Sequence, residues 1–499
     1  MCGVVAIIHC EPSISSYQYQ GEVQGEVYRA LLTLQHRGQD AAGIVSYDFN
    51  SSHFYEEKNL GLVSQVFNKE NLSALKGRMA IGHNRYATVG SDGRRDLQPM
   101  ISSYPFGVAM AHNGNIVNYF KLKELLKNNH HIQMLSHNDL ELILSLWGKA
   151  YLNSEKKIGP FTFARCTQAL QYLFETLVGA YSTVGIIADQ GVIAFRDPSG
   201  IKPLCFGKKL KEDGSFAYCF ASEEVALNFL DYKFERDLLP GEIIFVSLKG
   251  EFHSWVYPKA PVKSSCMFEW VYFAAAESSL EGRSVYGARL ALGEKLAIKV
   301  AALIALSKIS PDIVVPVPDT GRTAAIALAE KLRLPYREGL MKNRYVQRSF
   351  ILAEQNKREK AVELKLTPIK KEIEGKNILL VDDSIVRGTT SKKIISLLKK
   401  NGAGRITLAL SCPPIKNACY YGIDFPNSSD LAANKMNALE LAEFLGADSV
   451  VFIDQDDLYQ SIYNNKNKSG LCTACVSGNY PTSIECGEDF ALLRENHRG

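Results

Sequence analysis

The stretch Ile-Leu-Leu-Val-Asp-Asp-Ser-Ile-Val-Arg-Gly-Thr-Thr, residues 378–390, decides the fold of the second half of this chain. Its first four residues are apolar, as in a strand that is buried on both faces of a parallel sheet. Asp382 and Asp383 end that strand, and the loop after them leads into a helical pattern at residues 389–400. Because ligands of open α/β sheets bind beyond the carboxyl ends of the strands, this loop is a candidate ligand site.

The chemistry of the loop suits a phosphorylated sugar. Glycine lets the backbone approach a ligand, and helix N-terminal amides with threonine hydroxyls suit a phosphate. Adjacent carboxylates suit ribose hydroxyls and Mg²⁺. The stretch resembles the signature of type I phosphoribosyltransferases, which use phosphoribosyl pyrophosphate (PRPP). The resemblance implies that Asp382 and Asp383 hold the ribose and the metal. It also implies that the 5′-phosphate is wrapped by Arg387, Gly388, Thr389 and Thr390. The alternative is an ordinary strand that ends in an acidic turn.

Patterns around this stretch alternate between strand and helix from about residue 285, which predicts a parallel sheet. The loop 318–322 follows one predicted strand and opens a helix, so its N–H groups can face an anion. By resemblance it is the pyrophosphate loop, in which Asp319 contacts PRPP and Thr320 lies close to the metal. The resemblance also implies that residues 339–368, with Lys342 and Arg344 on PRPP, form a lid. An ordinary surface loop is the alternative there.

The first residues of the chain carry a second candidate site. Initiator Met is usually removed before a small residue, which would leave Cys2 as the N-terminal residue. A free α-amine has a pKa of about 7.7–8.0 and can act as a base at neutral pH. A thiol and an amine on one residue then form a nucleophile with its own base. An early cysteine alone means little, because most cysteines are small apolar core residues.

Four further motifs supply partners for this cysteine, at residues 35–40, 83–88, 112–115 and 138–139. In this order they resemble the glutaminase domain of N-terminal-nucleophile (Ntn) amidotransferases. The resemblance gives each matching residue an expected role. Asn113 and the Gly114 N–H would stabilise the oxyanion. Arg85 would bind the carboxylate of glutamine, and Asp139 would bind its ammonium. Thr88 would line the pocket, and Arg37 would lie near the nucleophile. His9, His83 and His112 are interpreted as structural.

The domain organisation follows from a change of pattern. Up to about residue 255 many short alternating strands are interrupted by a few helices, which predicts an α+β fold. By resemblance this part, residues 2–255, is a four-layer αββα glutaminase domain. Residues 258–261 form a linker, and residues 262–485 form an α/β phosphoribosyltransferase domain. Together the halves resemble the amidophosphoribosyltransferase family. That resemblance implies glutamine-dependent amination of PRPP at the first committed step of purine synthesis, with purine nucleotides as feedback inhibitors and a tetramer.

The cysteines suggest a metal site as well. Eleven cysteines in a chain expected to be cytoplasmic argue against a disulfide framework, and Cys472 and Cys475 form a CxxC pair. From spacing alone, zinc is a fair interpretation. With Cys266 and Cys419, the pair matches the ligands of the iron–sulfur subclass of the family, and four thiolates suit a [4Fe–4S] cluster. Zinc or no metal are the alternatives. The cluster is expected to be structural and remote from both active sites.

Composition fits a soluble enzyme. The 499 residues carry 57 basic and 53 acidic side chains, a net charge of +4 that gives no reason to expect nucleic acid. Charged residues make up 22% and hydrophobic residues 46%, which is ordinary for globular proteins. No apolar run reaches the roughly 20 residues that a membrane span needs. The N-terminus lacks the features of a signal peptide, so a cytoplasmic location is expected.

The chain departs from the family pattern at two places, and two rival hypotheses on its function stay open. The family usually reads Phe-Ala-Arg-Pro-Asp-Ser where this chain has residues 273–278, so Ala275 and Ala276 remove an arginine at the expected domain interface. Leu140 stands where the family prefers Ser or Thr. One rival is an Ntn amidotransferase acting on a sugar phosphate, which the 382–390 pattern disfavours. The other is a non-catalytic paralogue that senses PRPP or nucleotides.

Overall fold

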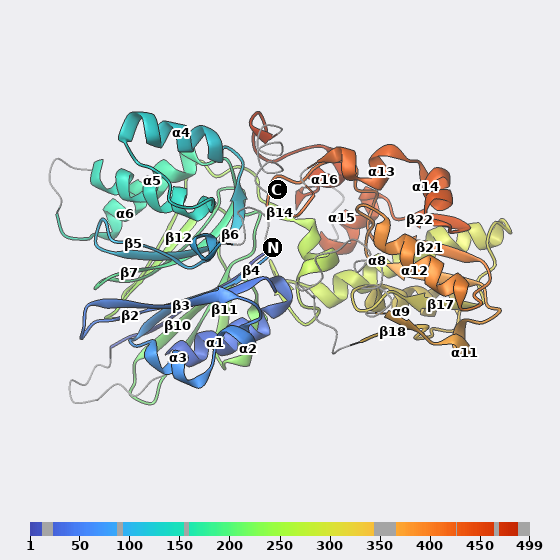
Figure 1. Cartoon of the computed structure of the whole chain (residues 1–499), viewed down its shortest axis with the longest axis horizontal. Coiled ribbons are helices and arrows are strands. Elements are labelled where there is room, and N and C mark those ends of the chain that lie inside the picture. The colour runs from blue at the N-terminus through green and yellow to red at the C-terminus, as the bar shows by residue number, and fades with distance from the viewer. Residues whose placement is uncertain are drawn as a thin grey trace.

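The computed structural model describes residues 1–11, 23–86, 93–153, 159–343, 366–425, 427–463 and 469–487. Two halves lie side by side, the first drawn in blue to green and the second in yellow to red (Figure 1). No helix in the described ranges is long and apolar enough to span a membrane. Thr88 and Arg344, two of the expected site residues, lie outside these ranges, as does most of the expected lid.

The first half contains two antiparallel sheets. The seven-stranded sheet has the order β11-β9-β10-β1-β4-β2-β3, and the six-stranded sheet has the order β13-β12-β8-β7-β6-β5. Their bounds are β1 (Gly3–His9), β2 (Ala41–Asp48), β3 (His53–Leu60), β4 (Met79–Arg85), β5 (Met100–Ser102), β6 (Val108–Ile116), β7 (Gly179–Ile187), β8 (Gly191–Arg196), β9 (Cys205–Leu210), β10 (Phe216–Ala221), β11 (Lys233–Asp237), β12 (Glu242–Ser247) and β13 (Phe252–Val256).

Helices cover the outer face of each sheet. On the seven-stranded sheet lie α1 (Val23–Thr33), α2 (Val63–Val66) and α7 (Glu224–Phe229), with η1 (Gln35–Arg37) and α3 (Lys69–Ala74) nearby. On the six-stranded sheet lie α4 (Tyr119–His130), α5 (Asp139–Asn153) and α6 (Phe163–Thr176). The short helix η2 (Arg94–Asp96) precedes β5.

The alternation of side chains along β1 explains why the layers stack in this way. Because successive residues of a strand point to opposite faces, Val4 packs between the two sheets while Val5 packs against α1. Ala6, Ile7 and Ile8 continue the alternation. The result is the four-layer αββα arrangement that the resemblance implied.

The second half is built on a parallel sheet of four strands in the order β17-β20-β21-β22, again as predicted. The strands are β17 (Ile313–Pro316), β20 (Ile378–Asp382), β21 (Ile406–Leu410) and β22 (Ser449–Phe452). One face packs on α8 (Val285–Ala305), α9 (Gly321–Leu332) and α15 (Gln455–Tyr463), and the other on α11 (Lys370–Ile373), α12 (Thr389–Lys400) and α14 (Ala438–Leu445). Leu379 and Leu380 of β20 point to opposite faces, so the strand is buried on both.

Smaller elements complete the second half. Strands β18 (Leu340–Lys342) and β19 (Leu366–Pro368) pair antiparallel, as do β15 (Ser279–Leu280) and β16 (Arg283–Ser284). The remaining elements are the π-helical turn η3 (Glu269–Phe273), η4 (Ser428–Asp430), α13 (Ala432–Lys435) and α16 (Ala474–Ser477).

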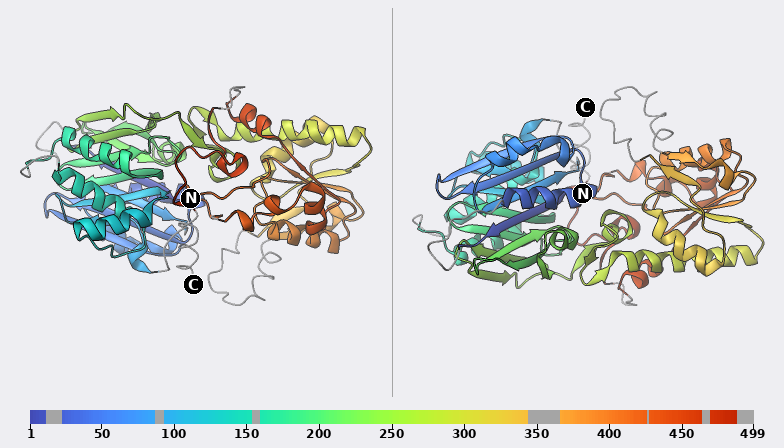
Figure 2. Two further views of the ribbon diagram at one scale, coloured as in Figure 1. Left: turned by 90° about the horizontal axis from the view of Figure 1, so that it is seen from above. Right: turned by 90° about the horizontal axis from the view of Figure 1, so that it is seen from below.

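A short parallel pair joins the two halves. Strand β14 (Ser264–Cys266) pairs with β23 (Gly470–Cys472), so the last part of the described chain returns to the first residues of the second half. On its other side β14 contacts the glutaminase-like half, because Cys266 N–H donates to the Ile201 carbonyl at 3.0 Å. The chain's N-terminus lies beside the same junction in both views of Figure 2.

Candidate active sites

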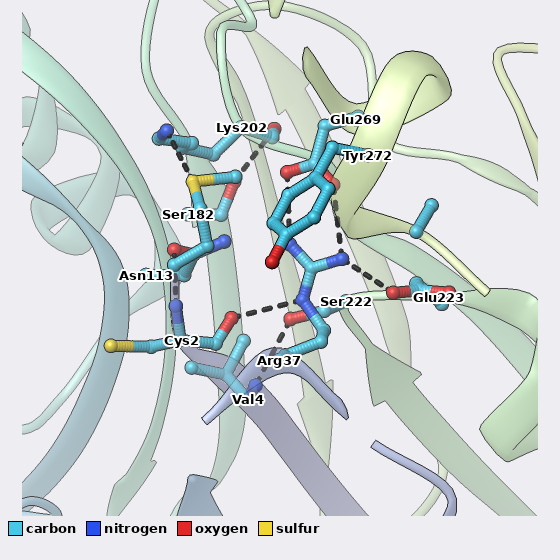
Figure 3. Close-up of polar contacts among 12 residues, drawn as sticks. Cys2, Val4, Arg37, Asn113, Ser182, Lys202, Ser222, Glu223, Glu269 and Tyr272 are labelled. Atoms are coloured by element: carbon cyan, nitrogen blue, oxygen red, sulfur yellow. Dashed lines mark hydrogen bonds and ion pairs between the residues drawn. The ribbon is translucent and has the colours of Figure 1, made fainter. Parts of the chain in front are cut away.

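The first site forms where the two sheets of the first half face the second half. Cys2 immediately precedes β1, and its backbone N–H donates to Asn113 Oδ1 on β6 at 3.0 Å (Figure 3). The Asn113 Nδ2 group is buried and has no hydrogen-bond partner in the described part of the chain. A buried donor without a partner is costly, so this amide is poised to bind an oxygen atom beside Cys2.

The neighbouring glycine is required by close packing. A Cβ at Gly114 would lie 1.9 Å from the Ala180 carbonyl oxygen on β7, well inside contact distance. Because the obstacle is backbone, no small rearrangement could accommodate a side chain there. Strand β6 therefore holds Asn113 beside Cys2 at a position where only glycine can follow.

Arg37, which we expected near the nucleophile, is fully buried between the halves. Its Nε donates to the Cys2 carbonyl at 3.0 Å, and its two terminal nitrogens bind Glu269 of η3 at 2.8 and 3.0 Å (Figure 3). It also pairs with Glu223. Burial alone would raise the pKa of Glu223, but Arg37 and His36 hold it well below its usual range. A charged network thus runs from Cys2 into the second half.

The altered segment at the interface still contacts this network. The Ala275 N–H donates to Glu223 Oε2 at 2.9 Å, and the Ser278 hydroxyl donates to the same oxygen at 2.7 Å. Ala275 makes its contact through the backbone, which does not depend on the side chain that the family usually carries. Loss of the arginine therefore leaves the halves connected here.

Met1 occupies a buried place beside Cys2. Its Sδ lies 2.6 Å from the ammonium of Lys202, which is itself fully buried and has no carboxylate partner in the described ranges. Burial, followed by Lys202 and Arg37, lowers the pKa of the terminal amine to about 5. The Met1 amine is therefore uncharged at neutral pH.

The other expected glutamine-binding residues lie close by. Arg85 is buried at the end of β4, and Asp139 is buried at the start of α5. Asp139 Oδ2 accepts from Ile116 N–H at 2.9 Å, and Oδ1 lies 3.2 Å from His112 Nε2. Although burial raises the pKa of Asp139, His112 and backbone N–H groups lower it below its ordinary value. The carboxylate is therefore charged at neutral pH.

The second site lies at the carboxyl edge of the parallel sheet. Strands β17 and β20 are neighbours, so the Thr320 hydroxyl reaches Asp383 Oδ1 and donates to it. Asp319 binds both Arg322 and Lys342, each at 2.7 Å. Burial and the adjacent Asp383 raise the pKa of Asp382 well above its usual value. Two neighbouring carboxyls with raised pKa values are relieved by a bound cation.

The expected phosphate cup forms the first turn of α12. Gly388 has φ of +76°, a left-handed conformation that a residue with a side chain adopts only under strain. Thr389 and Thr390 are exposed at the start of the helix. Arg387 is also exposed and lies 3.4 Å from Asp430. Hydroxyls and helix N-terminal amides thus face solvent at one edge of the sheet.

Both expected metal sites can be tested against the geometry. Within the described ranges, no group of three or more His, Cys, Asp or Glu side chains is placed to hold a metal ion. Mg²⁺ commonly takes only one or two carboxylates and completes its shell with substrate phosphates and water. Asp382 and Asp383 with the Thr320 hydroxyl therefore fit Mg²⁺ that arrives with PRPP.

The four candidate cluster cysteines are all buried in one apolar core. Cys266 and Cys472 are register partners across β14 and β23. Burial raises the pKa of Cys475 well above its usual value, and Cys419 is the first of several neighbouring cysteines that raise it further. The thiols gather in one region, and a four-iron cluster spaces its ligands more widely than a single ion does.

That these cysteines are remote from both active sites stays a prediction, although one indirect link connects them to the first site. Cys266 is hydrogen-bonded to Ile201, and the next residue, Lys202, contacts Met1. Residues 199–201 follow the edge of β14, so the link from Cys266 to the N-terminus runs through Lys202.

Several site neighbours carried no assigned role in the sequence. No role was expected from the sequence for Glu223, Glu269, Lys202 or Gln98. No local sequence pattern marks these residues, because each contacts residues far away along the chain.

Comparisons with known proteins match each half of the chain to a domain family. The glutamine amidotransferase domain family matches residues 83–228, and the phosphoribosyl transferase domain family matches residues 288–429. The amidophosphoribosyltransferase of Haemophilus influenzae is 39% identical over 100% of this chain and 96% of its own. A glutamine PRPP amidotransferase from B. subtilis, complexed with ADP and GMP, superposes with a TM-score of 0.81 at 35% identity, covering 97% of this chain and 98% of its own.

A structure described as the allosteric regulatory enzyme of purine biosynthesis superposes with a TM-score of 0.84 at 35% identity, covering 100% of this chain and 99% of its own. Fold and sites therefore define a glutamine amidotransferase joined to a phosphoribosyltransferase. Within that class, the chain belongs to the amidophosphoribosyltransferase family.

Proposed function

We propose that Cys2, Asn113 and the acidic pair Asp382 and Asp383 carry the two half-reactions of this amidophosphoribosyltransferase. The enzyme moves the amide nitrogen of glutamine to PRPP, which is consistent with the first step of purine biosynthesis. One observation carries the assignment of the first site. Asn113 binds the Cys2 N–H through Oδ1 and leaves a buried Nδ2 donor without a partner.

In the first half-reaction, removal of Met1 leaves Cys2 with a free thiol and a free amine. The amine takes the thiol proton, and the thiolate attacks the side-chain carbonyl carbon of glutamine. Asn113 Nδ2 and the Gly114 N–H stabilise the oxyanion. The proton then passes to the leaving nitrogen, ammonia departs, and water hydrolyses the thioester to glutamate. Arg85 binds the carboxylate of glutamine and Asp139 its ammonium. The pocket-lining role of Thr88 rests on the resemblance alone.

In the second half-reaction, ammonia attacks C1 of PRPP and the bond from C1 to the pyrophosphate oxygen breaks. Phosphoribosylamine and pyrophosphate result. Asp382 and Asp383 hold the ribose hydroxyls, and Arg387, Gly388, Thr389 and Thr390 bind the 5′-phosphate. Asp319, Lys342 and Arg344 contact the pyrophosphate end. Bound Mg²⁺, held by the acidic pair with Thr320, supplies charge neutralisation of the leaving pyrophosphate.

Cys266, Cys419, Cys472 and Cys475 are the proposed ligands of a [4Fe–4S] cluster. Their common burial and the Cys266–Cys472 register support the assignment. After anaerobic purification, each chain is expected to contain about four iron atoms and about four inorganic sulfides. Cys472→Ser is expected to lose both. One zinc per chain without iron would instead favour the alternative that the CxxC spacing left open.

Three further properties rest on the family. Purine nucleotides are proposed as feedback inhibitors, because a relative was solved with ADP and GMP. A homotetramer and a cytoplasmic location are proposed from the resemblance. No nucleic acid or membrane partner is proposed.

The deciding experiment measures glutamate and pyrophosphate release from glutamine, with and without PRPP and Mg²⁺, on anaerobically purified protein and Cys2→Ala. PRPP-stimulated glutamate release, matched by pyrophosphate and absent in Cys2→Ala, is expected. Release that ignores PRPP would mean that the halves are uncoupled. No release from protein that carries its metal and lacks Met1 would favour the sensor alternative.

A further inference from the structure

The pocket of the first site contains a histidine whose protonation can be deduced from its neighbours. His112 lies on β6 directly before Asn113 and is buried. Its backbone N–H donates to Gln98 Oε1 at 2.8 Å. Because a backbone N–H can only donate, this contact fixes which end of the Gln98 amide is oxygen.

The other end of the same amide then determines the tautomer of the ring. Gln98 Nε2 lies 2.9 Å from His112 Nδ1, and an amide nitrogen can only donate. Nδ1 must therefore accept and carries no hydrogen. The ring proton sits on Nε2, which lies 3.2 Å from Asp139 Oδ1, off the line of an ideal hydrogen bond. A second proton on Nδ1 would point at the Gln98 amide hydrogens, so this arrangement disfavours the imidazolium.

We infer that Gln98 and His112 are positioning residues that keep the charge of Asp139 available for the ammonium of glutamine. This inference rests on the proposed ammonium-binding role of Asp139. A neutral ring leaves the negative charge of the carboxylate in place, whereas an imidazolium would neutralise it. Ile116 N–H donates to the second oxygen at 2.9 Å and orients the carboxylate.

Other charged and titratable groups around this pair do not replace Gln98. Burial, the first cause, lowers the pKa of His83 well below its usual value, so His83 faces the pair uncharged. Gln98 also donates to Asn138 Oδ1 at 3.3 Å, beside Asp139. Arg85 from β4 and the terminal amine act on His83. Tyr119 from α4 faces Asp139, and Glu141 and Asp96 act on Tyr119 as well.

The test is Gln98→Glu, which has nearly the same shape but accepts a proton from Nδ1 and so favours the imidazolium. Gln133→Glu on the exposed loop before α5 is the matched control, because it makes the same charge change. The readout is kcat/KM of glutamine hydrolysis for glutamine and for its analogue without the 2-amino group. In Gln98→Glu the preference for glutamine should fall about tenfold or more through KM, and the control should keep it.

Each outcome is informative. A merely structural role for Gln98 would lower kcat/KM of both substrates equally and leave the preference intact, which would overturn the inference. If both Gln98→Glu and Asp139→Asn keep the preference for glutamine, the inference and the ammonium-binding role of Asp139 both fail. If Asp139→Asn loses the preference while Gln98→Glu keeps it, only the inference fails.

The wild-type protein gives an independent test should Gln98→Glu fail to fold. The ¹⁵N shifts of His112 should show the neutral ring with hydrogen on Nε2 at pH 7. A hydrogen on Nδ1, or an imidazolium, would contradict the deduction.

Discussion

The two active sites are assembled in opposite ways. The first brings together residues from distant parts of the chain, since Cys2 and Asn113 are 111 positions apart and Glu269 belongs to the other half. The second consists of two short loops, 318–322 and 382–390, that each follow a strand of one parallel sheet. A site made of local loops depends on the sheet alone, whereas a site made of distant residues depends on how the layers and halves pack.

The largest expected effect separates the two sites chemically. Cys2→Ala should lower glutamine-dependent formation of phosphoribosylamine by roughly 10⁴-fold or more, because no other group can form the thioester. Ammonia supplied directly bypasses the first site, so ammonia-dependent synthesis should stay close to wild type. The measurement is pyrophosphate release with each nitrogen source. Equal loss with both sources would mean that the second site depends on Cys2.

Asn113→Ala tests the unpartnered donor at the first site. Loss of one oxyanion donor typically costs about 10²–10³-fold in kcat. Glutaminase kcat should fall by that amount with a smaller change in KM, because Nδ2 acts on the transition state. The variant also loses the contact of Oδ1 with Cys2 N–H, so Asn113→Asp, which keeps that acceptor, is the matched control. If Asn113→Asp retains wild-type kcat, Nδ2 is not the donor.

How far the sequence predicts each site follows from the same contrast. Strand, acidic pair, glycine and helix start are contiguous at residues 378–390, so propensity and pattern place them together without knowledge of the tertiary fold. The contacts of Arg37 with Glu223 and Glu269, or of Gln98 with His112, have no local pattern. Only resemblance to a family pointed to Asn113 and Asp139, and neither pattern nor resemblance pointed to Gln98. The pairing of β14 with residues 199–201 has no local pattern either, because it joins the two halves of the chain.

Glu269→Gln tests how strongly the first site is tied to the second half. Removing one member of a buried ion pair costs about 3–5 kcal/mol, because the remaining charge stays buried. The cost should be near the lower figure here, since Arg37 keeps Glu223 as a partner. Thermal unfolding should show the loss. PRPP stimulation of the glutaminase should also weaken, and unchanged stimulation would show that this pair does not couple the halves.

Asp237 gives a test of the interface through pH. Burial, and then Glu281 of the second half, raise the pKa of Asp237 from 3.8 to about 6. The folded protein therefore binds the proton more tightly than the unfolded chain, and stability falls as the pH rises from about 4 to about 6. At about 1.4 kcal/mol per pKa unit, the loss is at most about 3 kcal/mol. Unfolding followed against pH should show this slope in wild type. Asp237→Asn should make the slope shallower without abolishing it, because Asp382 and Asp383 also have raised pKa values and act in the same direction.

Glu223 provides a control for that slope, because its pKa is shifted in the opposite direction from that of Asp237. Its pKa is lowered, so its contribution is present above the usual pKa of glutamate and is lost only as the pH falls below it. A slope between pH 4 and 6 that is as steep in Asp237→Asn as in wild type would assign the effect to other groups.

The smallest effect compares one matched helix cap in each half. Asn68 caps α3 by accepting from Asn71 N–H, and Asn437 caps α14 by accepting from Leu439 and Glu440 N–H. Replacing such a cap by alanine costs about 0.5–2 kcal/mol when the helix contributes to the fold. Helix α14 buries three side chains in the core of the second half, whereas α3 buries none, so a lost cap can be tolerated by local fraying only in α3. Asn437→Ala should therefore lower the unfolding free energy by about 1 kcal/mol and Asn68→Ala by only a few tenths. Equal losses in denaturant titrations would mean that burial does not set the value of a cap in this protein.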